Sequence, residues 1–144
     1  MKQVHIKQVE GLTFLAKGDT NHWVPIDGPK EFHGSAAGSR PKELLLMSLG
    51  SCTASDVDSI LRKKQVDLDD FTMEITGDDV ETYPKVFSKI HIEYIFTGNN
   101  ILQKDVERAI DLSQNKYCPI SAMLKKACEI SYSYKIIEKE KKES

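Results

Sequence analysis

The longest uninterrupted helical pattern in the chain runs from Pro41 to about Lys64, and it constrains the fold more than any other segment. Pro41 suits a first helical turn because proline lacks an N–H that would stay unpaired there, and Glu43 suits the positive end of the helix dipole. Leu44–Leu49 is apolar on nearly all sides, whereas charged residues gather in the second half. A helix that is apolar all round is usually buried. We therefore expect a central helix covered on several sides, with a partner subunit as one candidate cover.

Short segments on both sides of this helix alternate apolar and polar residues, a pattern typical of half-buried antiparallel strands. Glu10-Gly11 separates the first two and indicates a hairpin. A short strand around Val24 precedes the glycine- and alanine-rich segment 34–38, for which we expect a mobile loop. The main predicted strands are 4–9, 12–16, 71–76, 85–97 and 130–136.

Two shorter helices are expected near the C-terminus. The first has an apolar stripe starting at Leu102, is capped by Asn99 or Asn100, and ends near Tyr117. The second begins at Cys118-Pro119. We expect these elements to form a single domain over residues 1–138, followed by a charged tail, 139–144, that frays.

The composition of the chain limits the kinds of binding partner that we expect. The 144 residues include 20 basic and 22 acidic side chains, for a net charge of −2, so no general field favours nucleic acid or an anionic membrane. The first residues lack the apolar core of a signal peptide, and no stretch approaches the roughly 20 apolar residues of a membrane span. We expect a cytoplasmic protein without nucleic-acid or membrane partners.

The three cysteines are Cys52, Cys118 and Cys128. An odd number in a reducing compartment argues against a disulfide framework and leaves burial, metal binding or thiol chemistry. A zinc site is not predicted, because no C-x-x-C or H-x₃-H spacing occurs and the histidines lie on different expected elements. Those histidines are His5, His22, His33 and His91.

Each cysteine has a different local setting. Cys128 ends an apolar stripe, where a free cysteine usually behaves as a small hydrophobe. Cys118 precedes Pro119 at a helix N-cap, where unpaired N–H groups can stabilise a thiolate; a purely structural cap is the alternative. Cys52 lies about three turns inside the central helix, so a buried core cysteine is the default, although small neighbours would let a ligand approach its sulfur.

Two segments carry a family resemblance: 40–53, with the sequence RPKELLLMSLGSCT, and 116–121, with the sequence KYCPIS. They resemble the two cysteine motifs of the OsmC/Ohr family (osmotically inducible protein C and organic hydroperoxide resistance protein). The separation of Cys52 and Cys118 and the order of elements also resemble the family's. The resemblance implies an α+β intertwined homodimer, with antiparallel sheets wrapped around two central helices.

The resemblance also implies an activity. Cys52 would reduce organic hydroperoxides, and in some members hydrogen peroxide, and Cys118 would resolve the oxidised Cys52 as a disulfide. An external dithiol, such as a dihydrolipoyl group, would reopen the disulfide, and neither a metal nor an organic cofactor is implied. The expected role is defence against oxidative stress. Two alternatives stay open: a redox-quiet protein that binds a small ligand, and a sulfur-handling enzyme with Cys118 as nucleophile.

The sequence departs from the family at two charged positions. The family's peroxidases use an arginine from the N-terminal strand region and a glutamate directly after the motif proline, whereas Lys42 follows Pro41 here and no arginine precedes Arg40. Arg40 and Glu43 are the candidates for these catalytic roles, with Lys17 or Lys42 as other sources of positive charge. Adjacent helical positions differ by about 100°, so Glu43 is not a simple replacement. The alternative is that Glu43 serves the helix end and Arg40 is solvated.

Overall fold

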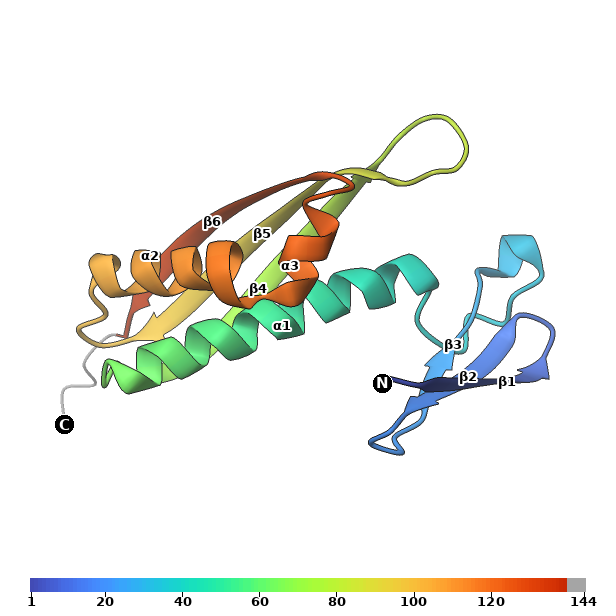
Figure 1. Cartoon of the computed structure of the whole chain (residues 1–144), viewed down its shortest axis with the longest axis horizontal. Helices are drawn as coiled ribbons and strands as arrows, with labels where there is room; N and C mark the ends of the chain where they lie inside the picture. The colour runs from blue at the N-terminus through green and yellow to red at the C-terminus, as the bar shows by residue number, and fades with distance from the viewer. Residues whose placement is uncertain (140–144) are drawn as a thin grey trace. The chain divides into compact units, whose positions relative to one another are not determined.

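The computed structural model describes residues 1–139 and has an α+β fold with two three-stranded sheets (Figure 1). The chain divides into two compact units, Met1–Met47 and a second unit that begins at Ser48. Helix α1 (Pro41–Lys63) starts in the first unit and ends in the second. Its bounds confirm the predicted long helix.

The first unit contains an antiparallel sheet of β1 (Val4–Glu10), β2 (Thr13–Gly18) and β3 (Val24–Ile26) in that order. Gly11 has a φ of +54° in the turn between β1 and β2, a conformation that glycine adopts without strain. The predicted hairpin is therefore confirmed. A short 3₁₀ helix, η1 (Lys30–Phe32), follows β3.

The segment after β3 is held by a buried carboxylate. Asp27 is 2% exposed and accepts hydrogen bonds from Thr13 Oγ1 (2.7 Å) and from the backbone N–H groups of Gly28 (2.7 Å), Ser35 (3.2 Å) and Ala37 (3.1 Å). Burial alone raises the pKa of Asp27, but these hydrogen bonds outweigh it and hold the pKa below its ordinary value. Instead of the mobile loop expected at 34–38, the structure shows a loop fastened to Asp27.

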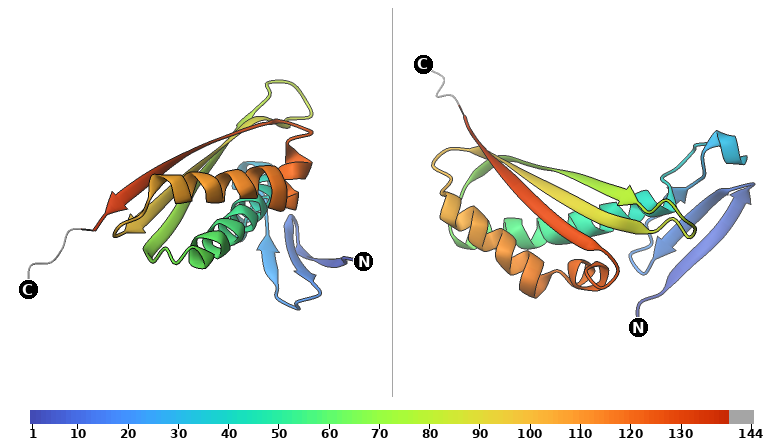
Figure 2. Two further views of the ribbon diagram at one scale, coloured as in Figure 1. Left: turned by 60° about the vertical axis from the view of Figure 1, so that its left-hand side comes forward. Right: turned by 90° about the horizontal axis from the view of Figure 1, so that it is seen from above.

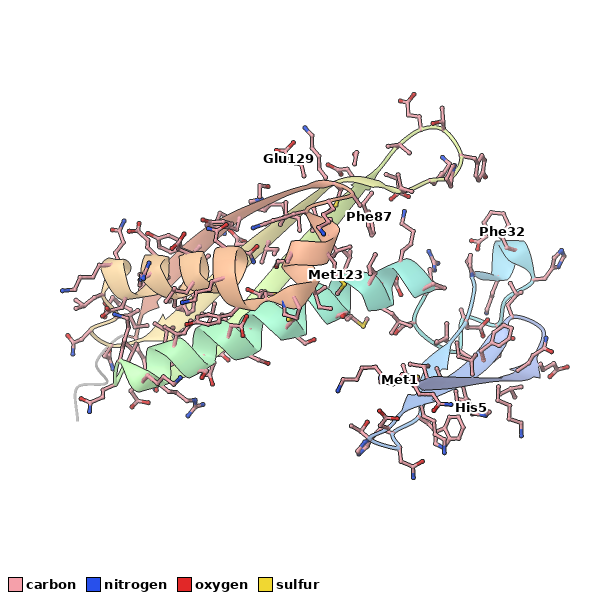
Figure 3. All side chains as sticks on the ribbon, in the orientation of Figure 1. Met1, His5, Phe32, Phe87, Met123 and Glu129 are labelled. Carbon is pink, nitrogen blue, oxygen red and sulfur yellow. The ribbon has the colours of Figure 1, made fainter. Side chains whose placement is uncertain are left out.

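The second unit contains a mixed sheet in the order β4-β5-β6, with β4 (Leu68–Asp79), β5 (Phe87–Gly98) and β6 (Glu129–Glu138). β4 and β5 pair antiparallel as predicted, whereas β6 runs parallel to β5. Phe87 and Glu129, the first residues of β5 and β6, accordingly lie at the same end of the sheet (Figure 3). The expectation of purely antiparallel sheets is wrong here, because the helices between β5 and β6 return the chain to the end where β5 began.

Helices α1 and α2 (Gln103–Leu112) cover one face of this sheet (Figure 2). Alternate residues of β5 are buried on that face, as the period of two requires. The apolar core consists of residues from α1, β5 and α2: Leu49, Val57, Leu61, Ile90, Ile92, Tyr94, Phe96, Val106, Ala109 and Ile110.

The ends of the shorter helices differ partly from expectation. The N-cap of α2 is Leu102 and makes no side-chain cap bond, so the predicted asparagine cap is wrong. After α2 the chain forms one π-helical turn, η2 (Ser113–Tyr117), and then α3 (Pro119–Leu124). The predicted end near Tyr117 and the start at Pro119 are confirmed.

Two further expectations concern α1 and the tail. By length and composition α1 passes as a candidate membrane span, contrary to the sequence expectation, although the core helix of a soluble protein passes the same test. Of the apolar run Leu44–Leu49 only Leu49 is buried, and Leu45 and Met47 are 40% and 53% exposed. In the predicted tail, Lys139 forms an ion pair with Asp69 (3.0 Å), and residues 140–144 lie outside the described residues.

Candidate active site

The structure brings Cys52 and Cys118 together. Cys52 lies on α1, Cys118 lies at the start of α3, and their Sγ atoms are 3.0 Å apart. Both are free thiols. An S–S bond is about 2.05 Å long, so the sulfurs need to move roughly 1 Å closer to form a disulfide.

Cys118 is the N-cap of α3, as the Cys-Pro pair predicts. Its Sγ accepts a hydrogen bond from Ser121 N (3.3 Å), Pro119 occupies the first turn, and the side chain is 3% exposed. The backbone N of Cys118 also donates to Ser113 O (2.9 Å), which ties this residue to η2. Local sequence therefore fixes the position of this sulfur.

Cys52 lies in an environment that disfavours its thiolate. Burial raises the pKa of the Cys52 thiol to about 11; the hydrogen bond and charge of Cys118 and the negative charge of Asp56 add to the rise, and the backbone N–H of Ile120 opposes it. At pH 7 a pKa of 11 leaves roughly one thiol in 10⁴ ionised. Rapid nucleophilic attack by Cys52 would therefore require a positive charge nearby.

Asp56 is a neighbour of the cysteine pair that sequence reasoning missed. It lies one helical turn after Cys52 on the same face of α1, and its carboxylate and both sulfurs lie within 4.8 Å of one another. The Cys-x₃-Asp spacing on a helix is the signal that could have revealed it. Two sulfurs and a carboxylate are atoms that can hold a metal ion.

A buried polar cluster connects this site to the core, and we define it as Thr53, Tyr94, Ser113 and Gln114. Thr53 Oγ1 lies 2.7 Å from Tyr94 Oη and 2.8 Å from Ser113 Oγ, and Gln114 Nε2 donates to Tyr94 Oη (2.8 Å). Ser113 Oγ in turn donates to Asp56 Oδ2 (3.0 Å). Sequence reasoning missed this cluster, although Thr53 and Tyr94 occupy positions that periodicity places on buried faces.

Two buried polar atoms beside these groups have no hydrogen-bond partner in the described part of the chain: Gln114 Oε1 and Ser121 Oγ. Ser121 follows Cys118 by three residues and donates its backbone N–H to that sulfur.

The other predicted site residues, Arg40 and Glu43, belong to the first unit. Arg40 N donates to Glu43 Oε2 (2.9 Å), which is the backward contact of a capping box, and both residues are exposed. This contact matches the alternative in which Glu43 serves the helix end. Their role beside Cys52 stays a prediction.

Cys128 has a different setting from the other two cysteines. Its Sγ donates to Leu124 O (3.6 Å), and burial raises its pKa. This is the behaviour expected of a small packing residue.

A cavity of about 410 Å³ opens within the second unit beside Asp56. Its walls combine apolar side chains with two lysines: Ser59, Ile60, Lys63, Lys64, Leu112 and Tyr117 complete the lining. Lys64 is paired with Asp105 (2.9 Å). The cavity has the mixed lining that suits a small amphipathic molecule.

The protein therefore belongs to a class defined by its fold and its site. The fold is α+β, and the site pairs a cysteine on a long core helix with a second cysteine that caps a short helix. The chain belongs to the OsmC-like protein family, whose model matches residues 33–133. This confirms the resemblance drawn from the two cysteine motifs.

The similarity to other proteins extends over almost the whole chain. Protein YhfA of Escherichia coli strain K12 is 40% identical over 135 residues, which is 94% of this chain and 98% of that protein. A hypothetical protein from Aquifex aeolicus VF5 is 32% identical, with a TM-score of 0.85 over 97% of this chain and 98% of that one. An organic hydroperoxide resistance protein, OsmC, from Legionella pneumophila is 15% identical, with a TM-score of 0.70 over 93% and 96%. The last similarity shows a shared fold.

Proposed function

We propose that the protein is a cytoplasmic, thiol-dependent hydroperoxide reductase that uses Cys52 and Cys118 in defence against oxidative stress. The observation that carries the proposal is the 3.0 Å separation of two free cysteine sulfurs contributed by different helices. Family membership and the hydroperoxide resistance protein among the structural relatives support it.

The proposed reduction of a hydroperoxide has three steps. The Cys52 thiolate attacks the O–O bond of the hydroperoxide, becomes a sulfenic acid, and releases an alkoxide that is protonated to the alcohol. The Cys118 thiol then condenses with the sulfenic acid to give the Cys52–Cys118 disulfide and water. An external dithiol, with a dihydrolipoyl group as the leading candidate, transfers two electrons and two protons to the disulfide and restores both thiols.

The proposed attack requires an activating charge, because the surroundings raise the pKa of Cys52 to about 11. Arg40 is the proposed source of that charge, with Glu43 orienting it. A guanidinium close to a thiolate favours the charged form. A variant Arg40→Ala should therefore slow the first step and leave the reduction of the disulfide unchanged.

We propose further that the active form is a homodimer. Among residues 1–47, all of which the structure describes, Ala16 is the only apolar side chain that is buried, and every residue of β1 is exposed. A small sheet needs cover on its apolar face to be stable in water. A second copy of the chain would cover this sheet and the exposed Leu45 and Met47 of α1.

The alternative is a redox-quiet protein that binds a small ligand. The raised Cys52 pKa and the 410 Å³ cavity beside Asp56 both favour it. In that case the cysteine pair would contact a ligand without turning over peroxide.

One assay distinguishes the hydroperoxide reductase from the redox-quiet binding protein. Consumption of cumene, tert-butyl and hydrogen peroxides is measured with dihydrolipoamide or dithiothreitol as reductant, for wild type, Cys52→Ser, Cys118→Ser and the control Cys128→Ser. We expect Cys52→Ser to lose turnover, Cys118→Ser to stop at the sulfenic acid, and Cys128→Ser to match wild type. Wild type that is no faster than Cys52→Ser with all three peroxides would remove the peroxidase proposal.

A further inference from the structure

Three metal-binding side chains converge at one point of the second unit. The ligand atoms of Cys52, Asp56 and Cys118 all lie within 4.8 Å of one another, and all three side chains are buried or half-buried. Two of the donors are sulfurs and one is a carboxylate oxygen. Surface acidic groups often cluster without binding anything, but two cysteines in such a cluster are chemically specific for thiophilic metals.

The backbone places these donors independently of any ligand. Cys52 and Asp56 are four residues apart on α1, so they share a face of the helix. Cys118 is fixed as the N-cap of α3 by its contact with Ser121 N (3.3 Å). A site built on two helix-bound positions and one cap requires little ordering when a metal binds.

The donors also have outer hydrogen bonds of the kind that orient metal ligands. Ser113 Oγ donates to Asp56 Oδ2 (3.0 Å) and fixes the direction of the carboxylate. Ser121 N donates to the Cys118 sulfur. Such outer partners typically change metal affinity by about 10-fold to 100-fold.

Charge and coordination number favour a divalent ion. Two thiolates and one carboxylate carry three negative charges in a half-buried space, and a divalent cation neutralises two of them. Three protein donors leave the fourth tetrahedral position of Zn²⁺ for water or an added thiol. Calcium and magnesium prefer oxygen donors and are disfavoured by the sulfurs.

The distance between the two sulfurs is shorter than a zinc site requires and longer than a disulfide bond. Tetrahedral Zn²⁺ with Zn–S bonds of about 2.3 Å needs the sulfurs about 3.8 Å apart, and a disulfide needs about 2.05 Å. The observed separation is 3.0 Å. A shift of roughly 1 Å in either direction therefore reaches one state or the other, and the two exclude each other.

We propose that Cys52, Asp56 and Cys118 form, in the reduced protein, a three-donor site for a thiophilic divalent cation, and that the Cys52–Cys118 disulfide abolishes it. Metal binding replaces the two thiol protons, which pass to solvent. Disulfide formation removes the same two protons together with two electrons. The metal and the disulfide therefore compete for the same two sulfurs, and oxidation of the pair releases the metal.

The first test titrates metal-free, full-length protein, reduced with a phosphine, with Zn²⁺ in competition with a chromophoric chelator. We expect one Zn²⁺ per chain, at least about tenfold weaker binding for Asp56→Asn, and a larger loss for Cys52→Ser and Cys118→Ser. Asp58→Asn is the matched control, because Asp58 lies on the same helix but is paired with Arg62 (2.7 Å) and is not one of the three converging donors. It should bind Zn²⁺ as wild type does.

The second test uses wild type alone and does not depend on how any variant folds. Diamide accepts two electrons and two protons from the thiols, so it forms the disulfide without a hydroperoxide, and the oxidised protein should lose Zn²⁺ binding. Co²⁺ added to reduced protein should give an absorption band from thiolate-to-cobalt charge transfer. Equal Zn²⁺ affinity of oxidised and reduced protein, or of Asp56→Asn and wild type, would overturn the proposal. Because no peroxide is used, its failure is distinct from failure of the peroxidase function.

Discussion

Replacing Asp56 with asparagine removes one negative charge beside the cysteine pair while nearly preserving side-chain shape. The carboxylate lies within 4.8 Å of both sulfurs and is one of the causes that raise the pKa of Cys52 to about 11. At about 5 Å, two unit charges interact by about 3 kcal/mol at an effective dielectric constant of 20 and by about 1 kcal/mol in water. The charge of Asp56 is the smallest of the causes that together raise the Cys52 pKa from 9.0 to about 11, so the lower figure applies. Since 1.36 kcal/mol corresponds to one pKa unit, the Cys52 pKa should fall by less than about 1 unit in Asp56→Asn.

The measurement is the rate of iodoacetamide labelling of Cys52 against pH, with chelator present, in a background where Cys118 and Cys128 are serine. Removing the negative charge favours the thiolate, so labelling near pH 8 should become several times faster, up to about fivefold. Asp58→Asn is the control: Asp58 is paired with Arg62, so this substitution should leave the labelling rate unchanged. An unchanged or higher Cys52 pKa in Asp56→Asn would refute the electrostatic reasoning.

Three other predictions test the buried polar cluster, the loop around Asp27 and the proposed dimer. Tyr94→Phe leaves Thr53 and Gln114 without a shared partner, and the free energy of unfolding should fall by about 1–3 kcal/mol in urea titrations. The lowered pKa of Asp27 means that its stabilisation is present above the unfolded-state pKa and is lost as pH falls through the folded value. Asp27→Asn should therefore flatten the acid-side loss of stability, and a midpoint of acid unfolding equal to that of wild type would contradict this. If the exposed Leu45 lies in a dimer interface, Leu45→Asp should convert a dimer to a monomer in light scattering, and a wild-type monomer at micromolar concentration would remove the dimer proposal.

Short sequence motifs correctly predicted the features of the fold that depend only on neighbouring residues, such as helix ends. Pro41 marks the start of α1, and Pro119 makes Cys118 an N-cap, because both depend only on the missing proline N–H and the helix that follows. The parallel pairing of β6 was not predictable from alternation, since parallel and antiparallel strands share the period of two. The loop around Asp27 was missed because its composition resembles a mobile segment, while its order comes from one buried carboxylate.

The sequence predicted the two cysteines of the site but not the residues that surround them. The resemblance supplied the pairing of Cys52 with Cys118, which no local pattern gives, because their contact depends on the path through two strands and two helices. Asp56 looked like one of several charges on the solvated half of α1. Only the fold shows that this carboxylate faces the sulfurs.

These surroundings bear on which cysteine would attack the hydroperoxide in the proposed reaction. Lowering the Cys52 pKa from about 11 to 7 takes about 5 kcal/mol, and one cation about 4 Å away supplies about 4 kcal/mol at an effective dielectric constant of 20. A guanidinium that also donates a hydrogen bond to the sulfur therefore supplies about what is needed, and a cation screened by water does not. In the proposed reaction, activation of Cys52 would accordingly require close approach of Arg40 or another cation. An Arg40→Lys variant that kept full peroxidase activity would show that charge alone suffices and that bidentate contact from the guanidinium is unnecessary.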